Sequence, residues 1–242
     1  MTEKKFSDYS SEIVHFFSID IPWLLEKAIK NRKNPNILDA GCGDGKLLHG
    51  LKCKGFLTDQ KKIVGVDLSP TRIRRLKNSS SFTCHVSDIT SMPFLKNNQF
   101  DLIINNQVIE HVPRQDLLLK ELQRVLDKKG ILYISSVIKK PYGWYFYRNN
   151  GKWVLDKTHV REYKNNREFL DILRQNGFQP IEIVNDNLWF SPLNMIIRKL
   201  NKKGIVRVSN NIYQKNRILR MLNHIRIPII GYKKIHVLAK KS

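Results

Sequence analysis

Five short apolar runs alternate with segments of helical length between residues 36 and 137, and this alternation strongly constrains the fold. Residues 36–40, 63–66, 100–104 and 131–137 are the most apolar of these runs. Short buried strands separated by helices are typical of a parallel sheet covered on both faces. We therefore expect an α/β, doubly wound fold, and a length of 242 residues suits one such domain with its own core.

Periodicity predicts the fifth of these strands and a long helix. Apolar residues at positions 82, 84 and 86 alternate with polar ones, which predicts a strand that ends at Asp88. Leu118, Leu122 and Val125 recur at helical spacing, and Gly130 predicts the end of that helix.

The last third of the chain contains an insertion that a minimal doubly wound domain does not need. We expect a helix at 168–176 closed by Gly177, a strand at 181–184 and a final strand at 234–239. Between the two strands, residues 192–230 form the insertion. Within it, apolar residues at helical spacing oppose basic ones: Ile218, Met221, Leu222 and Ile225 against Arg217, Arg220 and His224.

Charge is unevenly distributed along the chain. There are 43 Lys and Arg residues against 21 Asp and Glu residues, a net charge of +22. From residue 191 to residue 242 there are 13 basic residues and no acidic one. This asymmetry predicts a polyanionic neighbour, either an anionic membrane surface or a nucleic acid, although a generally lysine-rich composition gives the same count.

Cysteine usage and hydropathy indicate a cytoplasmic protein. Cys42, Cys53 and Cys84 are an odd number and have no metal-site spacing, which fits a reducing compartment. The first ten residues hold no apolar run, so we expect no secretory signal. No apolar stretch reaches the roughly 18 residues that predict a spanning helix.

Asp39 and three glycines, Gly41, Gly43 and Gly45, form a turn between the first strand and a helix. The P-loop pattern is absent, and a dinucleotide fingerprint needs its third glycine one residue later. The carboxylate of Asp39 would also repel a pyrophosphate. A ligand with a cationic amino acid end, such as S-adenosylmethionine, fits the turn better.

Four segments, in order, resemble the motifs of class I S-adenosylmethionine-dependent methyltransferases of the quinone-biosynthesis O-methyltransferase type. Residues 38–45 are similar to motif I, 64–70 to the ribose-binding strand end, 88–94 to the adenine loop and 100–112 to the fourth-strand motif. Ligands of open α/β sheets bind at such strand ends. The resemblance implies a mostly parallel, seven-stranded Rossmann-like sheet with an antiparallel last strand, preceded by the basic helical insertion.

The resemblance implies a methyltransferase with S-adenosylmethionine as cofactor. Its cofactor-binding residues would be Asp39, Ala40, Gly41, Cys42, Gly43, Asp67, Leu68, Arg72, Asp88, Ile89, Asn105, Asn106 and Gln107. Asp67 offers two acceptor oxygens to the two ribose hydroxyls. We expect a single domain with N-terminal lid helices (1–34), a cofactor-binding core (35–190), a basic amphipathic insertion (191–231) and a last strand (232–242).

Glu110, His111 and His159 are the candidate catalytic residues. His159 suits a general base because its neutral form is available near pH 7. Ordinary roles stay open, namely a helix start for Glu110 and His111 and a helix cap for His159. Some quinone-type and small-RNA methyltransferases bind a divalent metal with E-x-x-E-H and a distant histidine. Gln107 replaces the first carboxylate here, so we expect no metal.

Aromatic residues suit a flat or apolar acceptor, although the same rings would fit a core. They are Trp144, Tyr145, Phe146, Trp153 and Trp189. An N-terminal helix over the cofactor is predicted from Phe6, Tyr9, Phe16 and Phe17. We expect O-methyl transfer to a small or lipid-linked acceptor, peripherally on the inner membrane face. Action on RNA, or a non-catalytic scaffold, is the alternative.

Overall fold

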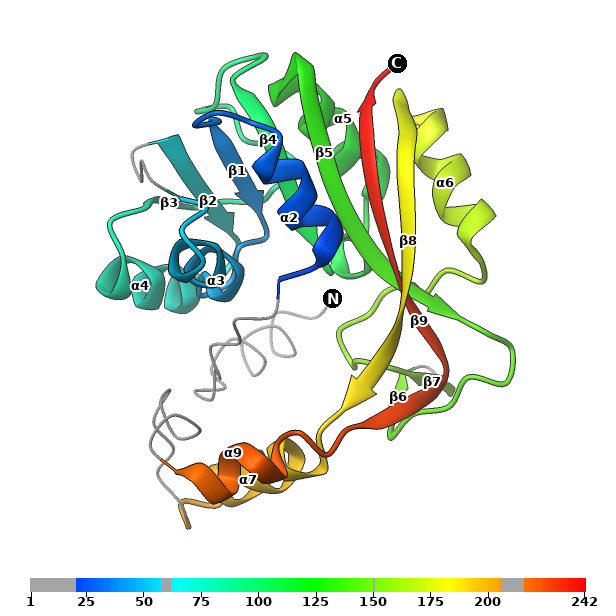
Figure 1. The fold of residues 1–242 in the computed structure, drawn as a ribbon. Coiled ribbons are helices and arrows are strands. Elements are labelled where there is room, and N and C mark those ends of the chain that lie inside the picture. The colour runs from blue at the N-terminus through cyan, green and yellow to red at the C-terminus, as the bar shows by residue number, and fades with distance from the viewer. Residues whose placement is uncertain (1–20, 58–61, 150, 206–215) are drawn as a thin grey trace.

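The structure, a computed structural model, describes residues 21–57, 62–149, 151–205 and 216–242. Seven strands form one sheet in the order β3-β2-β1-β4-β5-β9-β8 (Figure 1). The parallel strands are β3 (Thr83–Val86), β2 (Ile63–Asp67), β1 (Ile37–Ala40), β4 (Phe100–Asn106) and β5 (Leu126–Lys139). The last strand, β9 (Ile227–Lys241), runs antiparallel to β5 and to β8 (Phe178–Phe190). The predicted doubly wound sheet with an antiparallel last strand is confirmed.

Helices cover both faces of the sheet, and each face has its own core. One core contains apolar residues of α2 (Trp23–Lys30), α3 (Lys46–Cys53) and α4 (Pro70–Ser79). The other contains apolar residues of α5 (Gln115–Val125) and α6 (Asn166–Gln175). Since the strand order reverses between β1 and β4, their carboxyl ends form the switch point at which such sheets bind ligands.

Helix α5 and strand β3 both end before the residues that the sequence predicted. Helix α5 ends at Val125 rather than near Gly130, because the Val125 carbonyl accepts from the N–H of Gln99 at 2.8 Å and Leu126 pairs with Phe100. The chain is therefore already in β5 before the glycine. Strand β3 ends at residue 86, two residues before the predicted Asp88.

Strands β8 and β9 are much longer than predicted and form a two-stranded ribbon that leaves the body of the sheet (Figure 1). The ribbon ends in α7 (Pro192–Lys202) and α9 (Arg217–Leu222). Ile225, predicted to continue the second of these helices, lies beyond its end. A small hairpin, β6 (Tyr147–Asn149) and β7 (Lys152–Val154), stands beside the ribbon.

Within the described ranges, no helix combines the length and the apolar character that crossing a bilayer requires. Phe6, Tyr9, Phe16 and Phe17 lie outside the described residues, so the predicted helix over the cofactor is not addressed. Helix α2 packs on β5 and β9 through Leu24 and Leu25, which are buried.

Candidate active site

Backbone contacts hold the turn after β1 against the neighbouring strand. The N–H groups of Gly41 and Cys42 donate to the Val66 carbonyl at 2.7 and 3.1 Å. Gly41 has a φ of +89°, and a Cβ at this position would lie 2.5 Å from Cγ2 of Val108. Conformation and space therefore both require glycine here.

Asp67, at the end of β2, is bonded to both sides of the site. One carboxylate oxygen accepts from the Gly43 N–H at 2.9 Å and the other from the Ser69 N–H at 2.8 Å. Ser69 in turn caps α4 by accepting from the Arg72 N–H at 3.3 Å. Because a carboxylate oxygen has two lone pairs, each oxygen of Asp67 keeps one for a ligand hydroxyl.

The end of β4 is tied to both of its neighbours. Asn105 is fully buried and donates from its side chain to the Ala40 carbonyl of β1 at 2.8 Å. Gln107 has a φ of +57°, and its N–H donates to Oγ of Ser135 in β5 at 3.1 Å. The one-turn helix η2 (Ile109–His111) follows, so the position of this turn fixes the side chains next along the chain.

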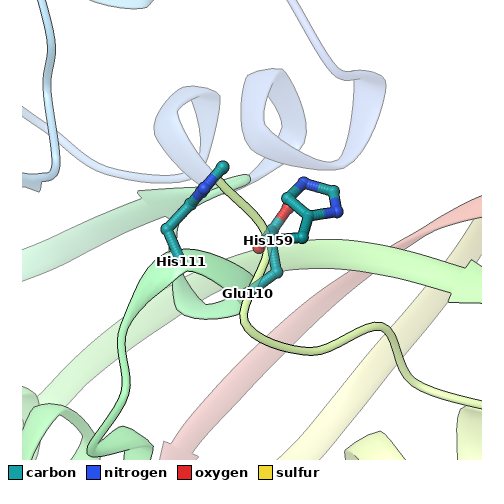
Figure 2. Close-up of side chains that lie close together, drawn as sticks. All are labelled: Glu110, His111 and His159. Carbon is teal, nitrogen blue, oxygen red and sulfur yellow. The ribbon is translucent and has the colours of Figure 1, made fainter. Parts of the chain in front are cut away.

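Glu110, His111 and His159 meet just beyond this turn (Figure 2). One nitrogen or oxygen of each side chain lies within 4.8 Å of those of the other two. The rings of His111 and His159 are in edge contact, with centroids 4.7 Å apart. The structure thus brings together the three residues predicted to be catalytic, from segments 48 positions apart in the sequence.

Arg161 fastens the loop that carries His159 to the segment that carries Glu110. Its guanidinium donates to the carbonyls of Ile109 at 2.9 Å and of Pro113 at 2.7 Å. The N–H of Val160 donates to the Glu110 carbonyl at 2.9 Å. These contacts hold the two segments of the cluster together without any contribution from the side chains of Glu110, His111 and His159.

A family model described as a methyltransferase domain matches residues 31–177, more than half of the chain. The chain is a class I S-adenosylmethionine-dependent methyltransferase. The ubiquinone biosynthesis O-methyltransferase of Pelagibacter ubique is 29% identical over 180 residues, which cover 67% of this methyltransferase and 73% of that protein. The protein of the same name from Bartonella quintana is 25% identical over 175 residues, covering 67% and 66%.

Solved structures agree with this fold. An S-adenosylmethionine-dependent methyltransferase from Archaeoglobus fulgidus has a TM-score of 0.56 at 21% identity and covers 90% of both chains. Geranyl diphosphate C-methyltransferase from Streptomyces coelicolor, solved with Mg²⁺, geranyl diphosphate and S-adenosyl-L-homocysteine, has a TM-score of 0.57 at 15% identity. It covers 90% of this methyltransferase and 77% of that chain. At these identities the likeness concerns the fold.

Two buried acceptors at the switch point fit the cationic end of S-adenosylmethionine. Oδ2 of Asp39 and Oδ1 of Asn105 have no hydrogen-bond partner among the described residues. Leaving buried acceptors unpaired is costly, and an ammonium group would satisfy them. Burial, together with the nearby Asp67 carboxylate, raises the pKa of Asp39 to about 7. A bound cation would return Asp39 to its ionised form.

The adenine-side residues are divided between surface and core. Leu68 is 52% exposed beside Asp67, where a ligand can reach it, whereas Ile89 is buried in the core. Asp88 is exposed, and its Oδ1 accepts from the N–H and the hydroxyl of Thr90, both at 2.8 Å. Asp88 therefore shapes the loop, and its contact with adenine stays a prediction.

Cys42 lies within the glycine turn, and the side chain of Arg72 lies beside that turn. Cys42 is buried, its Sγ lies 3.0 Å from where a Cβ on Gly65 would stand, and burial raises the pKa of its thiol. This arrangement agrees with a packing role. Nη1 of Arg72 lies 3.4 Å from where a Cβ on Gly43 would stand, so the guanidinium borders the turn.

Glu162, which the sequence analysis did not single out, orients His159. Its Oε1 lies 2.9 Å from Nδ1 of His159, and both side chains are 5% exposed. The carboxylate also accepts from the Leu155 N–H at 2.7 Å and from the Tyr232 hydroxyl at 3.1 Å. Because Nδ1 donates to Glu162, Nε2 of His159 is the nitrogen left to accept a proton. The sequence signal was the three-residue spacing from His159.

The pKa values of the cluster are shifted in opposite directions. Burial raises the pKa of Glu110 to about 7, although its Oε2 accepts from the Ser136 hydroxyl at 3.0 Å. Burial and the neighbouring His159 lower the pKa of His111, whose Nδ1 lies 2.9 Å from Oγ1 of Thr158. Near pH 7, therefore, His111 is neutral and Glu110 is partly protonated.

The cluster offers two imidazole nitrogens and one carboxylate oxygen, a donor set closer to that of transition metals than of Mg²⁺. Gln107 occupies the motif position at which a second carboxylate would add negative charge, and its side chain is a neutral amide. Our expectation that this methyltransferase needs no metal rests on that missing charge, and it stays a prediction.

Aromatic rings gather on the surface beside the ribbon. Trp144, Phe146 and Trp189 are about half exposed. The ring of Trp144 packs against Phe146 and Trp153 at centroid distances of 5.1 and 5.7 Å, and Tyr145 packs against Phe146 at 5.0 Å. The exposure of these three rings argues against a core role for them, whereas Tyr145 packs against a small core cluster, and contact with an acceptor stays a prediction.

Proposed function

We propose that this methyltransferase transfers a methyl group to a hydroxyl oxygen of a small, lipid-linked acceptor at an anionic membrane surface. The names of its relatives support this proposal, since they are O-methyltransferases of ubiquinone biosynthesis. The observation that carries the chemistry is the hydrogen bond from His159 to the buried carboxylate of Glu162.

Bound S-adenosylmethionine supplies an electrophilic methyl group on a sulfonium. An acceptor hydroxyl becomes a better nucleophile as its proton is removed, which a positioned base accomplishes. Nε2 of His159 takes that proton, and the Glu162 carboxylate stabilises the resulting imidazolium through Nδ1–H. Glu110, with its raised pKa, is the neighbouring group that can pass the proton onward.

The tip of the ribbon supports the choice of a membrane surface. Helix α9 has no buried residue, and Ile218, Met221 and Leu222 are exposed beside Arg217 and Arg220. Exposed apolar groups among cations and without acids suit an anionic lipid surface, where each cation near the surface adds about 1 kcal/mol. The aromatic cluster beside the ribbon supplies rings that prefer the interface.

Turnover assays test the chemistry. We expect purified protein with S-adenosylmethionine to methylate a catechol that carries a short prenyl chain, and His159→Asn to abolish turnover without loss of cofactor binding. Full activity of His159→Asn would refute the base. Activity that disappears with a chelator and returns with Zn²⁺ or Mg²⁺ would overturn the prediction of a metal-free reaction.

Vesicle binding tests whether the protein docks on an anionic membrane surface. Co-sedimentation is expected with vesicles containing anionic phosphatidylglycerol and not with neutral phosphatidylcholine vesicles. Replacing Arg217 and Arg220 by Glu should abolish it, whereas the matched change of Lys120 and Lys128, on the body of the domain, should not. Binding to total RNA without binding to vesicles would favour the RNA alternative instead.

A further inference from the structure

A chain of polar side chains crosses the sheet on the face that α2 covers, from the edge strand β8 to the end of β4. Oδ2 of Asp186 lies 3.3 Å from Nε2 of His236, whose Nδ1 lies 2.7 Å from the Tyr133 hydroxyl. The same hydroxyl lies 3.3 Å from Oδ1 of Asn106. His236 and Tyr133 are 2% and 0% exposed, so their partners must come from within the protein.

The Tyr133 hydroxyl has one proton and two acceptors beside it. It can donate to Nδ1 of His236 or to Oδ1 of Asn106, and not to both. Oδ1 of Asn106 already accepts from the Ser135 hydroxyl at 2.8 Å, which takes one of its two lone pairs. The second lone pair is therefore available to a ligand only while the proton of Tyr133 points toward His236.

The charges around His236 decide where that proton points. Burial lowers the pKa of His236 to about 4, with Lys234 acting in the same direction and Asp186 opposing them, so the ring is neutral near pH 7. Nε2 of His236 makes no hydrogen bond, but it lies 3.3 Å from the carboxylate of Asp186, whose negative charge favours a proton on this nitrogen. The neutral ring then has its lone pair on Nδ1, where it accepts from Tyr133.

We propose that His236 is a positioning residue of the cofactor site. It holds the hydroxyl proton of Tyr133 away from Asn106 and so leaves Oδ1 of Asn106 free to accept from the cofactor. The inference rests on the cofactor-binding role predicted for Asn106 and is independent of the acceptor and of the base. Binding measurements therefore test it even if the proposed O-methyl transfer is wrong.

Epistasis between two variants is the central test. In His236→Phe the hydroxyl of Tyr133 loses the imidazole as an acceptor and can donate to Asn106, and we expect the Kd for S-adenosylhomocysteine by calorimetry to rise about fivefold, the loss of one hydrogen bond. Tyr133→Phe has no such proton, so its Kd should stay within about twofold. The double variant should bind like Tyr133→Phe, since the misdirected proton is gone.

A merely structural role predicts no recovery, so the double variant would then bind no better than His236→Phe. Tyr163→Phe is the matched control: this buried tyrosine of the opposite core donates to Gln115 at 2.9 Å. It should not restore binding to His236→Phe. Wild-type affinity in His236→Phe, or binding in the double variant no better than in His236→Phe, would overturn the proposal.

Nitrogen-15 NMR of the imidazole gives a readout without core substitutions. The proton of His236 should reside on Nε2 in the wild type. In Asp186→Ala, a change at an exposed carboxylate, a substantial share should move to Nδ1, with a parallel rise in Kd for S-adenosylhomocysteine. A wild-type ring protonated on Nδ1 at pH 7 would refute the assignment, and so would an unchanged tautomer in Asp186→Ala.

Discussion

Oε1 of Glu162 accepts a hydrogen bond from Nδ1 of His159 at 2.9 Å, and water reaches little of either side chain. Glu162 accepts two further hydrogen bonds, from the N–H of Leu155 in the loop and from the hydroxyl of Tyr232 in β9. The histidine is therefore fixed in one tautomer and one orientation, as a base must be if it is to meet a substrate proton without rearrangement.

Removing this base should slow the reaction strongly. We expect His159→Ala to lower kcat by about 100-fold or more, and Glu162→Gln by about tenfold because the amide keeps an acceptor but loses the charge. Transfer of a radiolabelled methyl group measures both. His49→Ala, on α3 beside Ser79, is the control and should retain full activity. A kcat of His159→Ala within threefold of wild type would exclude the role.

Cofactor affinity should depend on pH through Asp39. Its pKa of about 7 in the free protein means that the carboxyl is mostly protonated at pH 6 and mostly ionised at pH 8. A cation binds the ionised form, so affinity for S-adenosylmethionine should rise about tenfold over this range. Calorimetry on Asp39→Asn should give no such rise, since the remaining titration, that of the ligand's own amine, removes positive charge as pH increases. Equal slopes would contradict the assignment.

Asp67 accepts from two backbone N–H groups and is also predicted to bind the ribose of the cofactor. Two substitutions separate these roles. Asp67→Ala removes the acceptors for Gly43 and Ser69 and should lower both stability and cofactor affinity. Asp67→Asn keeps one acceptor and the shape of the side chain. It should fold with a Tm within a few degrees of wild type and still bind S-adenosylmethionine at least about tenfold more weakly. Unchanged affinity in Asp67→Asn would remove the ribose role.

Glu110 should reduce stability at alkaline pH. Its folded pKa of about 7 lies above the unfolded value of 4.5, so the folded protein keeps this proton while the unfolded chain releases it. The contribution of Glu110 is most favourable below pH 4.5 and is lost as pH rises toward 7. Glu110→Gln should therefore be more stable than wild type by about 2 kcal/mol at pH 8 and little changed at pH 4. Thermal melts at both pH values measure this. If the folded protein kept Glu110 ionised at low cost, the wild type would be at least as stable as Glu110→Gln at pH 8.

The sequence predicted the part of the fold that local signals encode. The strands that end at Ala40 and Asp67 carry their own apolar runs and turn residues, and both lie where the pattern put them. The end of α5 was missed because pairing of Leu126 with Phe100 is a contact between strands, which no local pattern contains. The length of the β8–β9 ribbon was missed for the same reason.

The site was predictable to the extent that the motifs mark it. Glu110, His111 and His159 were singled out, and they do lie together. Glu162 and His236 were not, because each matters through a buried partner that becomes visible only when distant strands are in place. The aromatic residues were ambiguous from sequence, since periodicity cannot distinguish a core ring from one at the surface.

Strands β8 and β9 are still paired where the insertion begins, with Phe190 opposite Ile227 and Trp189 opposite Pro228. Antiparallel strands at this separation can be joined by a turn of a few residues. The segment between Phe190 and Ile227 therefore leaves and re-enters the sheet at one point, so it could be exchanged without altering the strands that carry the candidate active site.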